Sequence, residues 1–274
     1  MPSDPAVLDA FIQEASSSAK YAQIAPILVS RIAREEFNRH KSKKDALRAA
    51  RARLHQLVTA YLQPGVSFAR LNDSISALQP TNEQQLKEDL RALMRLHSST
   101  NERLPILDDF YRTSLAGVPP LRSVLDLGCG LNPLSYTWLP STDNCLYFAA
   151  DVVLPMIDSL NHFFSVMGMQ GEALVLDLSG DFNFNKSDLT MLLKILPLLD
   201  QIDKGLAPYL IDHIKSDYLL ISYPLKSLGG RGKGMLQTYR AHFLALMERK
   251  PWQYREVVFS NELVYICSRE SQIG

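Results

Sequence analysis

Apolar residues in the first hundred positions follow the spacing of amphipathic helices. In the stretch KKDALRAARARLHQLVTAYL they recur at steps of three and four residues, which puts them on one helix face: Leu47, Ala50, Leu54, Val58 and Tyr61. The same spacing continues in TNEQQLKEDLRALMRLHSSTNERL, where Thr81 or Asn82 is suited to cap a helix start. The pattern therefore predicts an all-helical unit over residues 1–105.

The pattern changes after the stretch AGVPPLR. Short apolar runs that end at Gly, Asp or Pro now alternate with stretches of helix length, which is typical of an α/β fold. The runs predict seven strands, at residues 123–127, 146–150, 173–176, 189–193, 218–223, 256–259 and 263–267. We expect the first five to be parallel and the last two to form an antiparallel hairpin around residues 260–262. The predicted fold class is α/β, with a seven-stranded sheet over residues 106–274 preceded by the helical unit.

Composition excludes several classes of protein. With 46% hydrophobic and 21% charged residues among 274, the chain has the balance of a globular protein and not of a disordered one. The first twenty residues lack the features of a signal peptide, and no run of about 18 uncharged apolar residues occurs, so we expect a cytoplasmic protein without a membrane partner. Cys129, Cys145 and Cys267 form no cluster, which argues against a disulfide framework and against a metal site.

Charge is unevenly distributed, although the net charge is zero. Between Lys20 and Ala60 there are ten Lys or Arg residues against three acids. Lys44, Arg48 and Arg51 recur at helical steps beside the apolar face, which predicts a basic helix face for binding RNA. A solvated helix face without a partner is the alternative.

Glycines and acids gather at the predicted carboxyl edge of the sheet, where parallel strands bind ligands. The first strand ends in VLDLGCGLNP, whose two glycines let a ligand lie against the backbone, and the next two strands end in an aspartate. Asp151 is suited to the two hydroxyls of a ribose and Asp177 to an adenine amino group. The predicted cofactor-binding residues on these strands are Asp126, Gly128, Gly130, Asp151, Asp177 and Leu178.

The glycine turn also indicates which cofactor it holds. Pro133 and Leu134 stand in the region where a dinucleotide-binding turn has its third glycine. A cofactor with an adenosine but no phosphate fits better, and S-adenosylmethionine (SAM) is the common one. An NAD-dependent enzyme is the less favoured alternative.

The stretch KSLGGRGKGM at residues 226–235 combines three cations with four glycines and has no acid. Such a loop suits an anion, either the phosphates of a nucleotide or an RNA backbone. Because the favoured cofactor has no phosphate, we expect Lys226, Arg231 and Lys233 to bind RNA phosphates.

These features together resemble the aminoglycoside-resistance 16S rRNA methyltransferases that modify N7 of guanine 1405 in the small ribosomal subunit. The resemblance covers most of the chain and rests on KY at 20–21, RLH at 53–55 followed by AYL, LHSSTNERL at 96–104, DLGCGLNPL at 126–134, LLKILPLLD at 192–200, SYPLKSLGGRGKGM at 222–235 and NELVYI at 261–266. It implies a Rossmann-like SAM-binding domain over 106–274 and a ribosome-docking helical domain over 1–105. It also implies that Arg103 binds the carboxylate of the cofactor.

Guanine N7 carries a lone pair and no hydrogen, so its methylation needs no general base. The target base must leave its stack to be reached. We therefore predict Lys194 and Pro197 as walls of a base pocket and Tyr223 as a stacking partner, with a core aromatic as the alternative for Tyr223. His97 is expected to be a capping or core residue and not a catalytic base.

The resulting expectation is a SAM-dependent methyltransferase of guanine 1405, acting as a monomer on 16S rRNA within the small (30S) subunit. Asn261 and Glu262 either line the RNA side or serve as turn residues. Two other functions stay open. One is methylation of a different rRNA base such as adenine 1408, and the other is an RNA-binding protein that kept the fold without catalysis.

Overall fold

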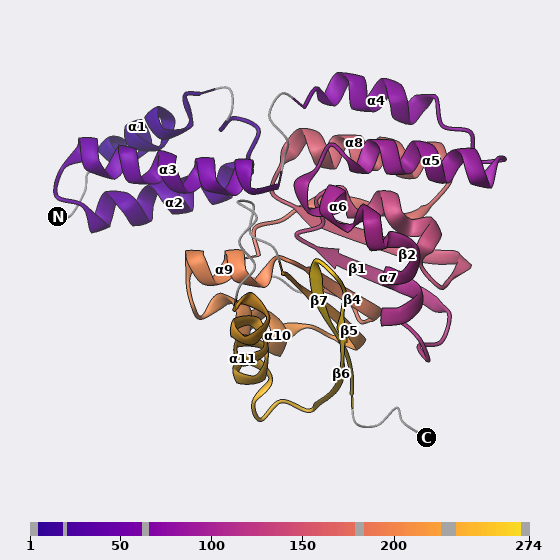
Figure 1. Cartoon of the computed structure of the whole chain (residues 1–274). Coiled ribbons are helices and arrows are strands. Elements are labelled where there is room, and N and C mark those ends of the chain that lie inside the picture. Colours follow the sequence, from indigo (N-terminus) through magenta and orange to yellow (C-terminus); the bar gives the residue numbers. More distant parts are fainter. Residues whose placement is uncertain (1–4, 19–20, 62–65, 179–183, 226–233, 270–274) are drawn as a thin grey trace.

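A seven-stranded sheet forms the centre of the computed structural model, which describes residues 5–18, 21–61, 66–178, 184–225 and 234–269 (Figure 1). The strands are β1 (Leu121–Leu127), β2 (Ser141–Asp151), β3 (Gln170–Val175), β4 (Ser187–Leu193), β5 (Ser216–Pro224), β6 (Trp252–Val258) and β7 (Glu262–Arg269). They lie in the order β3-β2-β1-β4-β5-β7-β6. Strands β1 to β5 are parallel, and β7 runs antiparallel between β5 and β6. The α/β fold class and the closing hairpin are thus confirmed.

The strand order reverses at β1, because β2 pairs with one side of it and β4 with the other. The connection after β1 leads to β2 and the connection after β4 leads to β5, so the two leave on opposite faces and a crevice opens beyond the carboxyl ends of these neighbouring strands. The glycine turn after β1 stands at this crevice.

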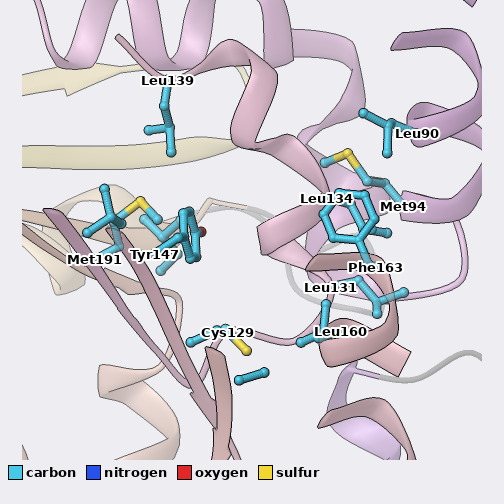
Figure 2. Close-up of a cluster of buried hydrophobic side chains, with 14 of the residues drawn as sticks. Leu90, Met94, Cys129, Leu131, Leu134, Leu139, Tyr147, Leu160, Phe163 and Met191 are labelled. Atoms are coloured by element: carbon cyan, nitrogen blue, oxygen red, sulfur yellow. The ribbon is translucent and has the colours of Figure 1, made fainter. Parts of the chain in front are cut away.

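Four of the helices pack on one face of the sheet: α4 (Phe68–Ser76), α5 (Glu83–Met94), α7 (Leu107–Ser114) and α8 (Leu154–Met167). Figure 2 shows part of the core they share, with Leu90 and Met94 of α5 close to Leu134 and to Phe163 of α8. Leu134 belongs to η2 (Asn132–Trp138), the 3-10 helix that follows the glycine turn. Because η2 is packed between these helices, the turn is anchored in the core.

The opposite face carries α9 (Leu196–Ile202), α10 (Leu206–His213) and α11 (Met235–Met247), which bury a second apolar core against the sheet (Figure 1). The start of α5 is capped by the side chain of Asn82, which accepts from the Gln85 N–H at 3.1 Å. Asn82 is one of the two residues predicted for this role.

The three N-terminal helices, α1 (Pro5–Ser16), α2 (Pro26–Arg39) and α3 (Lys43–Tyr61), pack on one another through two smaller apolar clusters. The segment before α2 joins them to the sheet, because Ala25 N–H donates to the carbonyl of Val152 at 2.7 Å and Leu154 N–H to that of Gln23 at 2.8 Å. Helices α4, α5 and α7 share the core of the sheet. The domain boundary at residue 105 stays a prediction.

Lys226, Arg231 and Lys233, which the sequence predicts to bind RNA, lie outside the described residues. Within the described ranges, no helix combines the length and apolar character needed to cross a membrane.

Candidate functional site

A pocket of about 650 Å³, including its open mouth, lies at the carboxyl edge of the sheet. Four of the predicted cofactor-binding residues are in its wall, namely Gly128, Asp151, Asp177 and Leu178. The remaining wall is mostly apolar and comes from α2, α8, α9, the turns that follow the strands and the residue before α6: Leu28, His97, Val152, Val153, Met156, Leu176, Ile195, Leu198, Leu199 and Ile202. An apolar pocket with a few polar groups in its wall is suited to a nucleoside.

The turn after β1 requires glycine at two positions. Gly128 and Gly130 have φ values of +64° and +53°, in the left-handed region that favours glycine. A Cβ atom on Gly128 would stand 2.7 Å from Ile195 Cδ1, and one on Gly130 would stand 2.4 Å from the His97 ring. The turn therefore packs directly against His97 and against the turn after β4.

His97 is buried at the N-terminus of α6 (Ser98–Arg103), where its side chain makes no capping hydrogen bond. Burial lowers the pKa of its imidazole to about 3, and the positive charges of Arg103 and Lys194 act in the same direction. The ring is therefore neutral at physiological pH. This geometry agrees with the core role expected for His97 and not with capping.

Asp151 is held in place by backbone donors from two segments. Its Oδ2 accepts from Gly130 N–H at 2.9 Å, and its Oδ1 accepts from the N–H groups of Val152 and Val153 at 2.7 and 3.3 Å. Burial raises the pKa of Asp151 above its ordinary value, and these backbone donors offset part of that increase. The carboxylate thus has a fixed position in the pocket wall, between the glycine turn and the start of α8.

Asp177 follows β3 and is tied to the N-terminal helices. Arg31 of α2 donates through Nε to Asp177 Oδ2 at 3.0 Å, and the Asp177 side chain is 8% exposed. The two residues are 146 positions apart. Because neither lies in a motif with the other, the sequence alone did not suggest this contact.

Asp126 is not in the wall of this pocket, and its predicted cofactor binding stays a prediction. Its Oδ2 accepts from Asn132 Nδ2 and from the Tyr147 hydroxyl, both at 2.8 Å. Side chains alternate along a strand, and Asp126 points to the face covered by α5 and α8. Burial raises its pKa to about 7. Asp126 therefore supports the turn after β1 through the hydrogen bond that it accepts from Asn132.

Arg103 and Glu262 form a fully buried ion pair. Arg103 Nη2 lies 2.7 Å from Glu262 Oε1, and Arg103 Nη1 donates to Asn132 Oδ1 at 2.8 Å. Burial alone would raise the pKa of Glu262, but the charges of Arg103 and Lys194 outweigh it and lower that pKa below its ordinary value. Glu262, left open between an RNA-facing and a turn residue, is therefore the internal partner of Arg103. Carboxylate binding by Arg103 stays a prediction.

Lys194 connects the turn after β4 to α6. Its backbone φ of +63° is unusual for a residue other than glycine, and its side chain is 3% exposed. The Nζ atom donates to Glu102 Oε2 at 2.9 Å and lies 3.4 Å from Glu262 Oε2. Pro197, in the first turn of α9, is not in the pocket wall, whereas its neighbour Leu198 is. That Lys194 and Pro197 enclose a base stays a prediction.

Tyr223 has no exposed face on which a base could stack. The residue is 0% exposed, and its ring stacks on Tyr239 with centroids 5.0 Å apart and planes at 24°. Its hydroxyl lies 2.9 Å from His242 Nδ1. In this conformation Tyr239 covers the ring, which favours the alternative, a core aromatic. That Tyr223 stacks on a base stays a prediction.

The predicted basic face of α3 is only partly free of internal contacts. Lys44 is exposed, and the Arg48 side chain is 82% exposed beside Asp45. Arg51 is half-buried and donates to the carbonyl of Glu14 at 2.7 Å, which ties α3 to the end of α1. Lys44 and Arg48 are thus open to an external anion, whereas Arg51 has a structural contact as well.

Comparison with known proteins finds relatives over nearly the whole chain. Residues 17–266 match the family model of ribosomal RNA methyltransferase (FmrO). The chain is 31% identical over 265 residues to the 16S rRNA (guanine(1405)-N(7))-methyltransferase of Micromonospora echinospora, covering 96% of this chain and 97% of that protein. It is 32% identical to the protein of the same name from Serratia marcescens, covering 92% and 95% of the two chains.

Solved structures give the same result. The 16S rRNA methylase RmtB superimposes with a TM-score of 0.79 at 26% identity and covers 96% of this chain and 98% of its own. The 16S rRNA methyltransferase RmtF, solved in complex with S-adenosyl-L-homocysteine, has a TM-score of 0.79 at 29% identity and the same coverage. The similarity therefore includes the N-terminal helices as well as the sheet.

Proposed function

The chain belongs to the ribosomal RNA methyltransferase (FmrO) family, and on this premise we propose that it methylates N7 of guanine 1405 in 16S rRNA, with SAM as methyl donor. The observation that carries the proposal is its similarity, over 96% of its length, to a methyltransferase named for this base and atom. Protection of the ribosome against aminoglycosides is part of the proposal, since stretches such as LHSSTNERL at 96–104 and SYPLKSLGGRGKGM at 222–235 resemble those of resistance enzymes.

The pocket fits SAM through residues of this chain. Asp151 has a fixed carboxylate for the ribose hydroxyls, Asp177 and Leu178 lie in the wall on the adenine side, and Gly128 lets the ligand approach the backbone. A relative has been solved with S-adenosyl-L-homocysteine, the product of methyl transfer. When bound, SAM supplies an electrophilic methyl group on a sulfonium centre.

The residues around the pocket suit a reaction without proton transfer. Attack by the guanine N7 lone pair leaves no proton to remove, so the protein's task is to orient the base and to exclude water, within an approach distance of about 3–3.5 Å. The neutral His97 ring and the ion-paired Lys194 sit in fixed places beside the turns that form the site. We assign them to shaping the site and not to acid–base chemistry.

We predict that the exposed Lys44 and Arg48 of α3 bind phosphates of the ribosomal subunit. Replacing Lys44 and Arg48 together by alanine should weaken subunit binding and make the slope of log K against log salt shallower by about 1 for each phosphate that is no longer bound. Binding is measured by filter retention at several salt concentrations. The control is Arg249→Ala, since this residue follows α11 and its side chain is 91% exposed. An unchanged slope in the double variant would count against docking through α3.

The proposed partner is the small ribosomal subunit. We propose that the enzyme acts on it as a monomer in the cytoplasm. The direct test is transfer of labelled methyl from SAM to purified small subunits, with binding of S-adenosylhomocysteine (SAH) measured in parallel. Transfer supports the enzyme. Binding of RNA without either transfer or SAH binding would instead favour the non-catalytic RNA-binding protein, and transfer to adenine 1408 would favour the other rRNA methyltransferase.

A further inference from the structure

Helix α2 forms one wall of the pocket, although it belongs to the N-terminal helices. Leu28, which is 2% exposed, lines the pocket beside Val152 and Val153. Arg31 lies one turn further along the same helix and reaches Asp177 in the pocket wall. A displacement of α2 would therefore change both the apolar surface and the acidic group on the adenine side.

Arg31 also belongs to a series of ion pairs that extends from Asp177 in the pocket wall to α3. Its Nη1 donates to Glu35 Oε1 at 2.8 Å, while its Nε contacts Asp177. Arg53 of α3 donates to Glu35 Oε2 at 2.9 Å and to Glu36 Oε1 at 2.5 Å. These contacts connect α3, which carries Lys44 and Arg48 further toward its N-terminus, with the carboxylate in the pocket.

Three of the four side chains that link α3 to the pocket are partly or largely buried: Arg31 is 25% exposed, Arg53 is 19% exposed and Asp177 is 8% exposed. Glu35, which contacts both arginines, is 38% exposed. Ion pairs of this kind are screened less than fully exposed ones, so each contact has a directional effect on its partner. An arginine that contacts two acids through separate nitrogen atoms fixes their relative positions, which a lysine point charge does less well.

We propose that Arg31 is a positioning residue of the cofactor pocket: it orients Asp177 toward the adenine amino group and thereby makes cofactor affinity depend on the placement of the docking helices. This inference rests on the proposed function for the identity of both ligands. A carboxylate can accept from an arginine and from a further donor at the same time. Because thermodynamic coupling is reciprocal, binding of SAH and binding of the subunit then strengthen each other by the same factor.

The first test needs no ribosome. In Arg31→Ala, the dissociation constant of SAH should rise about tenfold, the loss expected when a hydrogen bond to a charged group is misaligned. Arg31→Lys should lie between this variant and the wild type, because it keeps the charge but not the fork. Arg34→Ala is the matched control, since Arg34 is an exposed residue of the same helix. Titration calorimetry measures all four proteins, with thermal melts as a check on folding.

A specificity measurement separates positioning from general loosening of the pocket. S-inosylhomocysteine carries a carbonyl oxygen where SAH carries the adenine amino group, so a carboxylate facing it is left without a donor. The wild type should prefer SAH, and the preference should fall by about tenfold in Arg31→Ala. An unchanged preference would overturn the positioning role even if both ligands bound more weakly.

The coupling is tested by repeating the SAH titration with saturating small subunits. We expect the wild type to bind SAH about fivefold or more tightly on the subunit, and Arg31→Ala to lose most of that gain. Equal tightening in both proteins, or none in the wild type, would overturn the coupling.

These titrations, together with the methyl-transfer assay on small subunits, distinguish this inference from the function on which it rests. A wild type that binds SAH with the expected preference but methylates no subunit would contradict the proposed reaction and leave the role of Arg31 in the pocket supported. A wild type that fails to bind SAH would contradict both.

Discussion

Asp151→Ala is expected to lower the affinity for S-adenosylhomocysteine (SAH) by about 100-fold or more, since two hydrogen bonds to a charged group are lost at about 1.5–3 kcal/mol each. The carboxylate is held in one position by the N–H groups of Gly130, Val152 and Val153. Removing it also leaves those three donors without their acceptor. Titration of SAH by calorimetry measures the effect.

Two further variants make the Asp151 result interpretable. Asp151→Asn keeps one acceptor oxygen and should retain part of the affinity, which separates loss of the bond to the ribose from collapse of the turn. Asp158→Ala removes an exposed acid from α8 and should bind SAH like the wild type. Wild-type affinity in a folded Asp151→Ala protein would show that the ribose is bound elsewhere.

Glu262→Ala should lower the free energy of unfolding by about 3–5 kcal/mol, the cost of leaving one member of a buried ion pair without its partner. Arg103 and Glu262 are both 0% exposed, and Arg103 Nε also lies 3.2 Å from each oxygen of Glu262. Lys194 would lose a neighbouring negative charge as well. Denaturant unfolding followed by circular dichroism gives the free energy.

A control at the surface sets the scale for Glu262. Glu248→Ala removes a side chain that is 71% exposed, and its effect should stay within about 0.5 kcal/mol. The double variant Arg103→Ala with Glu262→Ala should lose less stability than the two single losses added, because neither charge is then left alone. Strict additivity would mean that the pair does not act as a unit.

Short apolar runs in the sequence were sufficient to predict the seven strands, and the lengths of the segments between them were sufficient to predict which strands are parallel. The limits of strands were less accurate. Strand β2 begins at Ser141 and β6 at Trp252, whereas the apolar runs predict starts at 146 and 256. The added residues of β2 at Ser141–Asn144 are polar and exposed, so hydrophobic pattern carries no signal for them.

Long-range contacts explain most of what the sequence did not reveal about the site. Arg31 and Arg53 were counted in a basic segment, yet each is paired with acids, because Glu35 of α2 contacts Arg53 of α3 and Asp177 comes from a distant loop. Asp126 was grouped with Asp151 and Asp177 as a strand-end acid. Asp126 lies inside β1, level with Ala149 and therefore two residues short of Asp151 along the sheet, and its carboxylate is enclosed by Asn132 and Tyr147. The apolar runs do not show how far each acid stands from the edge of the sheet.

Mapping of the methylated base tests the proposed methylation of guanine 1405 most directly. Small subunits from a bacterium that lacks this modification are incubated with the protein and labelled SAM, then treated with borohydride and aniline, which cleave RNA at 7-methylguanine. We expect one new cleavage at guanine 1405 of 16S rRNA, absent when the protein or SAM is omitted. Label without cleavage there, or cleavage at another guanine, would contradict the proposed methylation.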